Sequence, residues 1–373
     1  MSMQSMQNNL NEELNRLSVN AADFQPDTSL FQYIRWMNET IENQDENFKT
    51  NYLPIIEQEK EQIAETRPFL SVVIRTQGKR REMLREAILS LAGQSDEDFE
   101  VLLIGHKLDE DEECSVRKIL DEQPGSLKRK IRYIPWNQGT RAAPLNVGFS
   151  YAHGEYVAFL DDDDIVFDNW VECFHKAALE KPGTIIHTYA IAQKWITVKC
   201  GETEQVLRSV GAPEDTFCVG FEMLRQLECN RCPLMSLAFP AVYFQKYGIC
   251  FDESLTTTED WDFLMRTASF AGVTNVPEPT AIYRLWQNAE NSHTVHTQNE
   301  WEKNYDIIQE KFKNMPVLLP KGSLKVFVFY REQSANISLR TALKEKLRQK
   351  IPRPIWFIAK KLYRFFGGKK WLG

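Results

Sequence analysis

Tyr156-Val-Ala-Phe-Leu160 is followed directly by Asp161-Asp162-Asp163-Asp164. Five apolar and aromatic residues predict a buried strand, and the abrupt change to four acids marks its end. Four adjacent carboxylates repel one another, so the arrangement is costly unless a cation or hydrogen-bond donors gather around it. Mg²⁺ or Mn²⁺ suits such oxygen ligands, and the alternative is a solvated acidic turn.

Apolar runs alternate with helical patterns on the N-terminal side of this strand. Strands are expected at 69–74, 100–105 and 131–134, and helices at 82–92, 115–121 and 141–152. This alternation predicts a parallel sheet with helices on both faces. Ligands of such sheets bind outside the carboxyl ends of the strands, where Thr76, His106 and the aspartates fall. We therefore expect a site at that edge.

The second half of the chain is less regular. Strands are expected at 184–191, 195–198 and 236–244, a short helix at 221–228, and a helix that starts near Thr256. The first turn of that last helix carries Glu259 and Asp260. Spacing alone favours a capping role for them, with a threonine N-cap and acids near the helix N-terminus.

Composition describes a globular protein of 373 residues, 43% of them hydrophobic. The N-terminus has no signal-peptide pattern and no run is long enough to cross a bilayer, so we expect a cytoplasmic protein. Residues 341–373 hold seven lysines and three arginines against one glutamate, which gives +9 and leaves −16 for residues 1–340 of a chain of net charge −7. An acidic body argues against nucleic acid as the main partner.

The basic tail has apolar residues on one helical face and Lys360, Lys361 and Arg364 opposite. This pattern predicts an amphipathic helix at the inner face of the cell membrane, bound to anionic lipid. The alternative is a helix docked on the acidic body.

Seven cysteines without a framework spacing indicate reduced thiols. Only Cys229-Asn-Arg-Cys232 is suggestive, and with Cys218 and Cys250 it could form a zinc site, although a lone CxxC is a weak signal. At the N-terminus, residues 1–66 are expected to form a polar helical extension with a break near Pro54.

An ordered set of motifs resembles the inverting family-2 glycosyltransferases of the GT-A fold. The motifs are Ser71-Val-Val-Ile-Arg-Thr76, Ala87-Ile-Leu-Ser-Leu-Ala-Gly-Gln94, Asn137-Gln-Gly139, Asn146-Val-Gly148, 152–164, Gly248-Ile-Cys-Phe-Asp252, Glu259-Asp260-Trp261-Asp262 and Tyr283-Arg284. The resemblance covers about residues 68–292. It implies an α/β fold with a Rossmann-like, mostly parallel sheet over residues 67–292. A helical extension at 1–66 precedes this domain, and a helical and strand extension at 293–335 and the basic amphipathic tail at 336–373 follow it.

The same resemblance implies a reaction and its residues. A sugar passes from a nucleotide-sugar donor to a hydroxyl of a glycan or lipid-linked glycan, as in cell-surface polysaccharide synthesis, with Mn²⁺ or Mg²⁺ as cofactor. The implied residues are Asp260 and Glu259 for catalysis; Arg75, Thr76, His106, Asn137, Asn146, Asp161 and Asp162 for the nucleotide sugar; Trp261 and Arg284 for the acceptor; and Asp161, Asp163 and His293 for the metal.

Two positions depart from the family pattern. His106 stands where an aspartate usually recognises the nucleotide base, and Trp286 stands where a metal-binding histidine is common, so His293 or His296 would have to replace it. Two other functions therefore stay open. One is a nucleotidyltransferase of similar fold, and the other is a catalytically silent, membrane-peripheral binding or scaffolding module. A homo-oligomer is possible in each case.

Overall fold

The computed structural model describes residues 44–61, 67–200, 204–288 and 297–314. By their contacts the residues divide into two units, 1–317 and 318–373, and everything described below belongs to the first. The predictions for residues 1–43, for His293 and His296, and for the basic tail lie outside the described residues.

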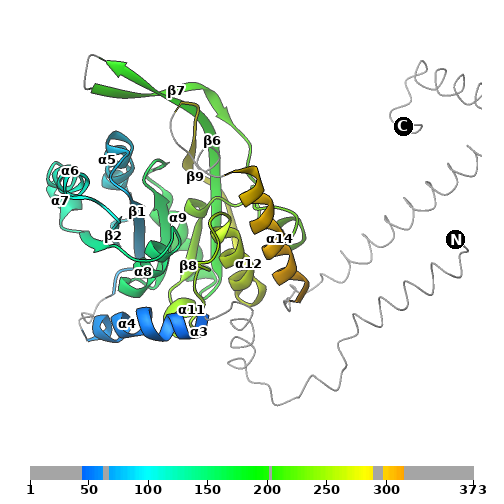
Figure 1. Ribbon diagram of the computed structural model, residues 1–373. Helices are drawn as coiled ribbons and strands as arrows, with labels where there is room; N and C mark the ends of the chain where they lie inside the picture. Colours follow the sequence, from blue (N-terminus) through cyan, green and yellow to red (C-terminus); the bar gives the residue numbers. More distant parts are fainter. Residues whose placement is uncertain (1–43, 62–66, 201–203, 289–296, 315–373) are drawn as a thin grey trace, which may run out of the picture. The chain divides into compact units, whose positions relative to one another are not determined.

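One sheet organises the described part of the chain, and nine strands contribute to it (Figure 1). The strands are β1 (Leu70–Thr76), β2 (Phe99–His106), β3 (Ile131–Trp136), β4 (Tyr156–Asp161), β5 (Ile165–Val166), β6 (Ile185–Cys200), β7 (Glu204–Glu214), β8 (Leu237–Pro240) and β9 (Val273–Trp286). Their order is β3-β2-β1-β4-β8-β6-β9-β5, and β7 forms a hairpin with β6.

The predicted parallel arrangement is confirmed for β1 to β4. β1 pairs in parallel with both β2 and β4, and β2 pairs in parallel with β3. Further along the sheet β6 and β9 are also parallel, but β8 is antiparallel to its neighbours β4 and β6, and β5 is antiparallel to β9. The sheet is thus parallel in its first half and mixed in its second.

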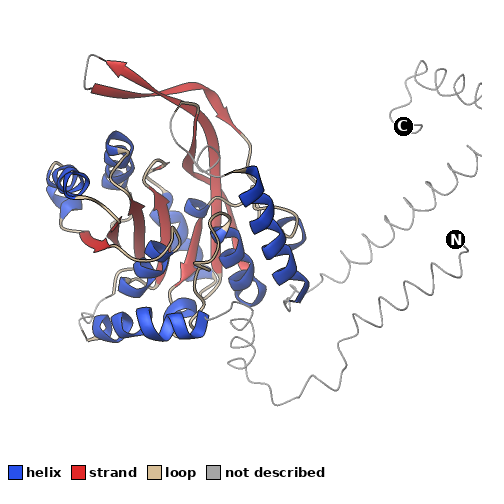
Figure 2. Ribbon diagram, viewed as in Figure 1, coloured by secondary structure: helices blue, strands red, loops and turns tan. Residues whose placement is uncertain are grey.

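Helices cover both faces of the sheet (Figure 2). They are α5 (Arg81–Ser90), α6 (Glu110–Asp121), α7 (Gly125–Lys128), α8 (Ala143–Tyr151), α9 (Trp170–Glu180), α10 (Met223–Gln226), α11 (Val242–Gln245), α12 (Glu259–Ala271) and α14 (Gln298–Asn314), with short 3-10 turns η2 (Leu91–Gly93) and η3 (Leu234–Ser236).

Alternating strand residues feed two cores, as a period of two requires. On β4, Val157 and Phe159 pack with α8, α11 and α12, whereas Ala158 and Leu160 pack with α5, α6 and α9 on the other face. Because both faces are covered, the strand is apolar throughout and gives the unbroken apolar run seen in the sequence.

Three predicted elements differ from the structure. The expected strands at 184–191 and 195–198 form one strand, β6, and the expected strand 236–244 ends at Pro240, where α11 follows. The predicted break near Pro54 is wrong. α3 (Gln44–Asn47), a π-helical turn η1 (Phe48–Tyr52) and α4 (Leu53–Lys60) follow one another directly, and Pro54 lies at the start of α4, where the π-helical turn changes to an α-helix.

The helix α14 packs against α12. Its residues Ile308 and Phe312 share a cluster with Trp261 and Met265 of α12. Lys311 makes salt bridges with Asp252 and Asp262, both of which are buried. The last described helix therefore supports the segment that carries the predicted base.

Candidate active site

Three strand ends bring the predicted polar residues to one edge of the sheet. In the register of the parallel strands, Arg75 lies beside Asp161, and Thr76 lies beside Gly105, the residue before His106. Parallel strands present their carboxyl ends at the same edge, which explains the grouping.

Hydrogen-bond donors surround the acidic corner after β4. The Thr76 hydroxyl donates to Asp162 at 2.6 Å, and Arg80 contacts both Asp162, at 2.6 Å, and Asp163. Arg80 lies in the loop after β1, two residues beyond a turn at Gly78. The φ of Gly78 is +71°, which suits glycine, and its N–H donates to the Thr76 hydroxyl. Thr76 and Arg80 thus supply hydrogen-bond donors and positive charge to the two middle aspartates, Asp162 and Asp163.

The fourth aspartate, Asp164, has a structural role. Its side chain accepts from the backbone N–H of Arg284 at 2.7 Å, and it is buried. The side chain of Arg284 is itself buried, lies over the rings of Trp195 and Trp286, and donates to Glu86 at 2.7 Å. Arg284 therefore joins β9 to α5, and acceptor binding by Arg284 stays a prediction.

One guanidinium connects the acidic corner to α12. Arg75 donates to Asp161 at 3.1 Å and to Glu259 at 3.0 Å, and it also donates to the backbone carbonyl of Arg141. Arg141 contacts the same Glu259 oxygen at 2.9 Å. Glu259 is buried and held by two arginines, so it anchors the start of α12.

The threonine cap expected at this helix is absent. Thr258 precedes α12 with a φ of +61°, and its hydroxyl donates to the carbonyl of Thr257 rather than accepting from a free N–H of the helix. A left-handed threonine is costly. The side chain of Glu259 turns toward the arginines, whereas Asp260 accepts from the backbone N–H of Trp261, so the capping interpretation fails for Thr258 and holds in part for the acids.

The carboxylates of this edge differ in pKa. Burial on its own raises the pKa of Asp161 and of Glu259, but neighbouring arginines, chiefly Arg75 and Arg141, outweigh it and lower both. At Asp163, burial and the adjacent aspartates outweigh Arg80 and raise the pKa to about 7. Crowded negative charge at Asp163 is thus only partly compensated.

Asp260 is the carboxylate best suited to proton transfer. It is partly exposed, accepts from the Asn230 amide at 2.9 Å and from the backbone N–H of Trp261 at 2.8 Å, and makes no salt bridge in the described residues. Burial, followed by the charge of Glu259, raises the pKa of Asp260 to about 6. A base with a pKa just below neutrality is ionised at pH 7 and is stronger than an ordinary aspartate.

Trp261 does not face the site. It is 1% exposed, its indole N–H donates to the carbonyl of Gln226 at 2.7 Å, and its ring packs edge-on against Phe312 of α14. In this structure α14 covers the ring, and stacking of Trp261 on an acceptor sugar stays a prediction.

The remaining predicted residues fall into two groups. His106 lies at the edge, where its Nε2 contacts the carbonyl of Gln138 at 3.1 Å and burial lowers its pKa, and Asn137 is exposed just after β3. Asn146, by contrast, is fully buried and bonds both backbone groups of Phe251. Asn146 thus braces residues behind the site.

Sequence reasoning missed three residues, Arg80, Arg141 and Asn230. Each lies in a loop, and nothing in the spacing places it opposite a particular carboxylate. Trp286, at the position of the usual histidine, is 3% exposed and packs against Trp195.

Comparison with known proteins finds a family that part of this chain resembles. Residues 71–209 match the model described as glycosyl transferase family 2. A Rickettsia felis protein called an uncharacterized glycosyltransferase is 27% identical over 239 residues, which is 62% of this chain and 36% of that protein. A Rickettsia prowazekii protein of the same description is 24% identical over 267 residues, which is 70% of this chain and 78% of that protein.

Among solved structures, S. aureus TarS 1-349 in complex with UDP-GlcNAc is 19% identical, with a TM-score of 0.49, and the match covers 67% of this chain and 68% of that one. The chain thus spans about a third of the first relative and about three quarters of the second. The predicted resemblance is confirmed: residues 71–209 match glycosyltransferase family 2, a family of transferases, and the relatives are described as glycosyltransferases.

Proposed function

We propose that this protein transfers a sugar from a nucleotide-sugar donor to a hydroxyl group with inversion, using a divalent metal at Asp161 and Asp163 and Asp260 as the base. The supporting observation is the single guanidinium of Arg75, which contacts both Asp161 and Glu259, the residue before Asp260. It links one carboxylate that would hold the metal to the first turn of α12, where Asp260 would activate the acceptor.

The carboxylate oxygens at the acidic corner suit Mg²⁺ or Mn²⁺ as ligands. Asp161 and Asp163 keep 34% and 15% of their side-chain surface exposed, and carboxylate oxygens are the ligands that hard cations prefer. The raised pKa of Asp163 indicates uncompensated negative charge, which a divalent ion would relieve. Arg80 is itself 34% exposed, so it can move aside. When bound, the metal would stabilise charge on the departing diphosphate.

The residues then divide the work. Asp161 and Asp163 would hold the ion, while Thr76 and Arg80 hold Asp162. Asp260 removes the proton from the acceptor hydroxyl, whose oxygen forms a bond to the anomeric carbon as the bond to the phosphate oxygen breaks. Asn230 orients the Asp260 carboxylate through its 2.9 Å hydrogen bond. One base and a leaving group stabilised by a cation favour transfer, since hydrolases of glycosides use two carboxylates.

The acceptor that fits this proposal is a glycan or lipid-linked glycan of a cell-surface polysaccharide, met at the cytoplasmic side of the membrane. The support is the composition of residues 341–373, whose ten basic residues and interleaved aromatics suit an anionic lipid surface. Within the described part of the chain, no helix combines the length and the apolar character needed to cross a bilayer.

The test begins with the donor. A panel of nucleotide sugars is screened by thermal shift with Mn²⁺, because a ligand that binds only the folded state raises its melting temperature. The best donor is then incubated with glycan and lipid-linked acceptors, and the nucleotide product is identified. We expect a nucleoside diphosphate, and release of pyrophosphate would indicate a nucleotidyltransferase.

Asp260→Asn tests the base. We expect transfer to fall by about 10²- to 10⁴-fold while the thermal shift with donor and Mn²⁺ is kept. Asp121→Asn, at an exposed position outside the site, is the control and should retain full activity. Activity of Asp260→Asn within a factor of a few of wild type would refute the assignment, and a donor panel without any shift would refute nucleotide-sugar binding.

A further inference from the structure

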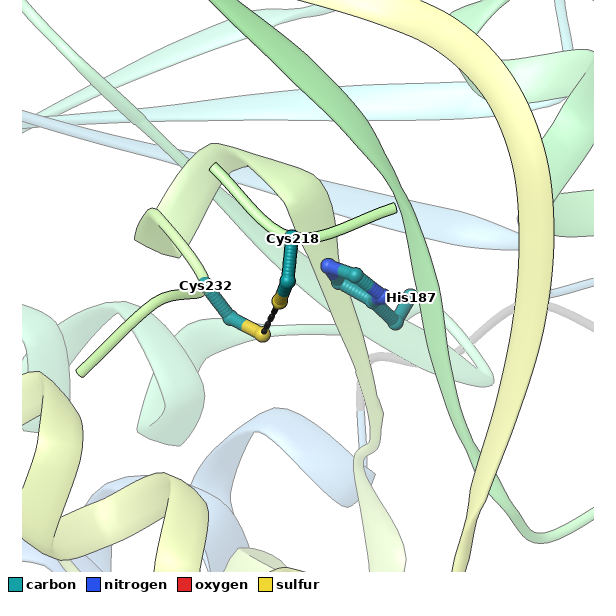
Figure 3. Close-up of side chains that lie close together, drawn as sticks. All are labelled: His187, Cys218 and Cys232. Atoms are coloured by element: carbon teal, nitrogen blue, oxygen red, sulfur yellow. Dashed lines mark hydrogen bonds between the residues drawn. The ribbon is translucent and has the colours of Figure 1, made fainter. Parts of the chain in front are cut away.

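A second group of metal-ligating side chains lies away from the acidic corner. His187 on β6, Cys218 in the segment after β7 and Cys232 in the segment after α10 bring one ligand atom each within 4.8 Å of the others. The two sulfur atoms are 3.4 Å apart, and Figure 3 shows the imidazole directed toward them. His187 and Cys232 are buried, and Cys218 is partly exposed, which gives an ion a way in.

The imidazole of His187 is fixed in the form that binds metals. Its Nδ1 lies 3.2 Å from Oδ1 of Asn275, and the same oxygen accepts from the backbone N–H of Phe221 at 2.7 Å. Because Oδ1 only accepts, Nδ1 must carry the proton, and the lone pair is on Nε2. His187 is 1% exposed, and its Nε2 has no hydrogen-bond partner. A buried, unpartnered nitrogen is costly, and a ligated ion removes that cost.

The two sulfur atoms accept hydrogen bonds from one side chain, that of Gln226. The side-chain amide of Gln226 donates to Cys232 Sγ at 3.0 Å and points to Cys218 Sγ at 3.6 Å, while its oxygen accepts from the backbone N–H of Arg231 at 3.0 Å. That second bond fixes which end of the amide faces the sulfurs. Donors directed at sulfur favour the thiolate, the form that binds metals.

We propose that His187 Nε2, Cys218 Sγ and Cys232 Sγ bind one borderline-soft divalent cation, for which Zn²⁺ is the best match. Two thiolates on one tetrahedral zinc lie about 3.8 Å apart, so the sulfurs need to separate by only about 0.4 Å. Thiolate and imidazole are the ligands that zinc prefers over Mg²⁺ or Mn²⁺, so this site and the acidic corner select different ions.

This ligand set differs from the zinc site that the sequence suggests. Cys229 is exposed, and Cys250 is buried elsewhere with its sulfur on the carbonyl of Gly248. The CxxC pair therefore contributes Cys232 alone, and His187 and Cys218 complete the set from distant parts of the chain.

The ion would join β6 to the loop beside the base. Asn230 accepts from the backbone N–H of Cys232 at 3.1 Å and donates to Asp260. Fixing Cys232 thus fixes the residue that orients Asp260. This consequence for catalysis rests on the proposed function, whereas the metal site itself does not.

The experiment measures metal directly. The full chain, purified under reducing conditions, is analysed for zinc by mass spectrometry, and then stripped and titrated with Co²⁺. We expect about one zinc per chain and, with Co²⁺, the charge-transfer absorption of cobalt–thiolate bonds. Carboxylates give no such band, so ions at the acidic corner do not contribute to it.

Three variants locate the site. Cys232→Ser and His187→Asn should lose the zinc and weaken or abolish the band, whereas Cys229→Ser, from the same CxxC, should keep both. Wild-type protein that neither contains zinc nor develops the band would overturn the proposal even if a variant fails to fold. A full zinc content in Cys232→Ser would also overturn it, as would a Cys218–Cys232 disulfide found by mass in freshly purified, alkylated protein.

Discussion

Removal of the Arg75 guanidinium should destabilise the protein, because one side chain neutralises two carboxylates. In Arg75→Met, Asp161 and Glu259 both lose a partner, and the carbonyl of Arg141 loses a donor. Breaking a buried ion pair costs about 3–5 kcal/mol. Two features reduce that figure here, since Glu259 keeps Arg141 at 2.9 Å and Asp161 is 34% exposed and can be rehydrated. We therefore expect a loss of about 2–3 kcal/mol in the free energy of unfolding.

Urea denaturation at pH 7 without divalent metal measures this loss. Arg225→Met is the matched control, because its salt bridge with Glu222 is exposed and should contribute less than about 0.5 kcal/mol. The pH dependence gives a second check. Arg75 helps to lower the pKa of Asp161 and of Glu259, so its contribution is complete above their unfolded pKa values of about 4 and disappears as the pH falls through the lower folded values.

The difference between wild type and Arg75→Met should therefore be largest near neutrality and shrink below about pH 4. A loss no greater than that of Arg225→Met would refute the bridge between the acidic corner and α12. So would a difference that grows as the pH falls.

Three further results are expected. Arg80→Ala should lower the melting temperature without metal, because Asp162 and Asp163 lose the guanidinium that neutralises them. Mn²⁺ should then raise the melting temperature of this variant by more than it raises that of wild type. Equal shifts in scanning fluorimetry would speak against a metal at this corner. Transfer activity, as kcat/KM, should fall about tenfold per pH unit below about pH 6, where Asp260 becomes protonated, and a flat profile from pH 5 to 7 would exclude Asp260 as the base. Deletion of residues 341–373 should release the protein from anionic vesicles in a flotation assay, and unchanged flotation would assign membrane binding to another part of the chain.

In the first half of the fold, β1, β2 and β4 are readable from the sequence because they are buried on both faces. Each appears as a mainly apolar run and is predicted to within one or two residues. The second half lacks that signal. β9 contains Pro277 and Pro279, which usually argue against a strand, and its register with β6 shifts near them.

The site divides in the same way. The aspartates and Asp260 are visible in the sequence because acids gather at the end of a strand and at the start of a helix. Their partners are not, because Arg80, Arg141 and Asn230 reach them through loops. The burial of Trp261 cannot be read from the sequence either, since only the packing of α14 shows that the ring is covered.

Lys311 is 11% exposed, and its two salt bridges show that the stable part of this protein extends well past the family match at residues 71–209. A shortened chain ending after β9 would leave Asp252 and Asp262 charged without their ammonium partner and would expose Trp261 to water. A shortened form for crystallisation or for fusion to another domain should therefore keep everything through residue 314, although that last helix makes no salt bridge with the carboxylates of the proposed site.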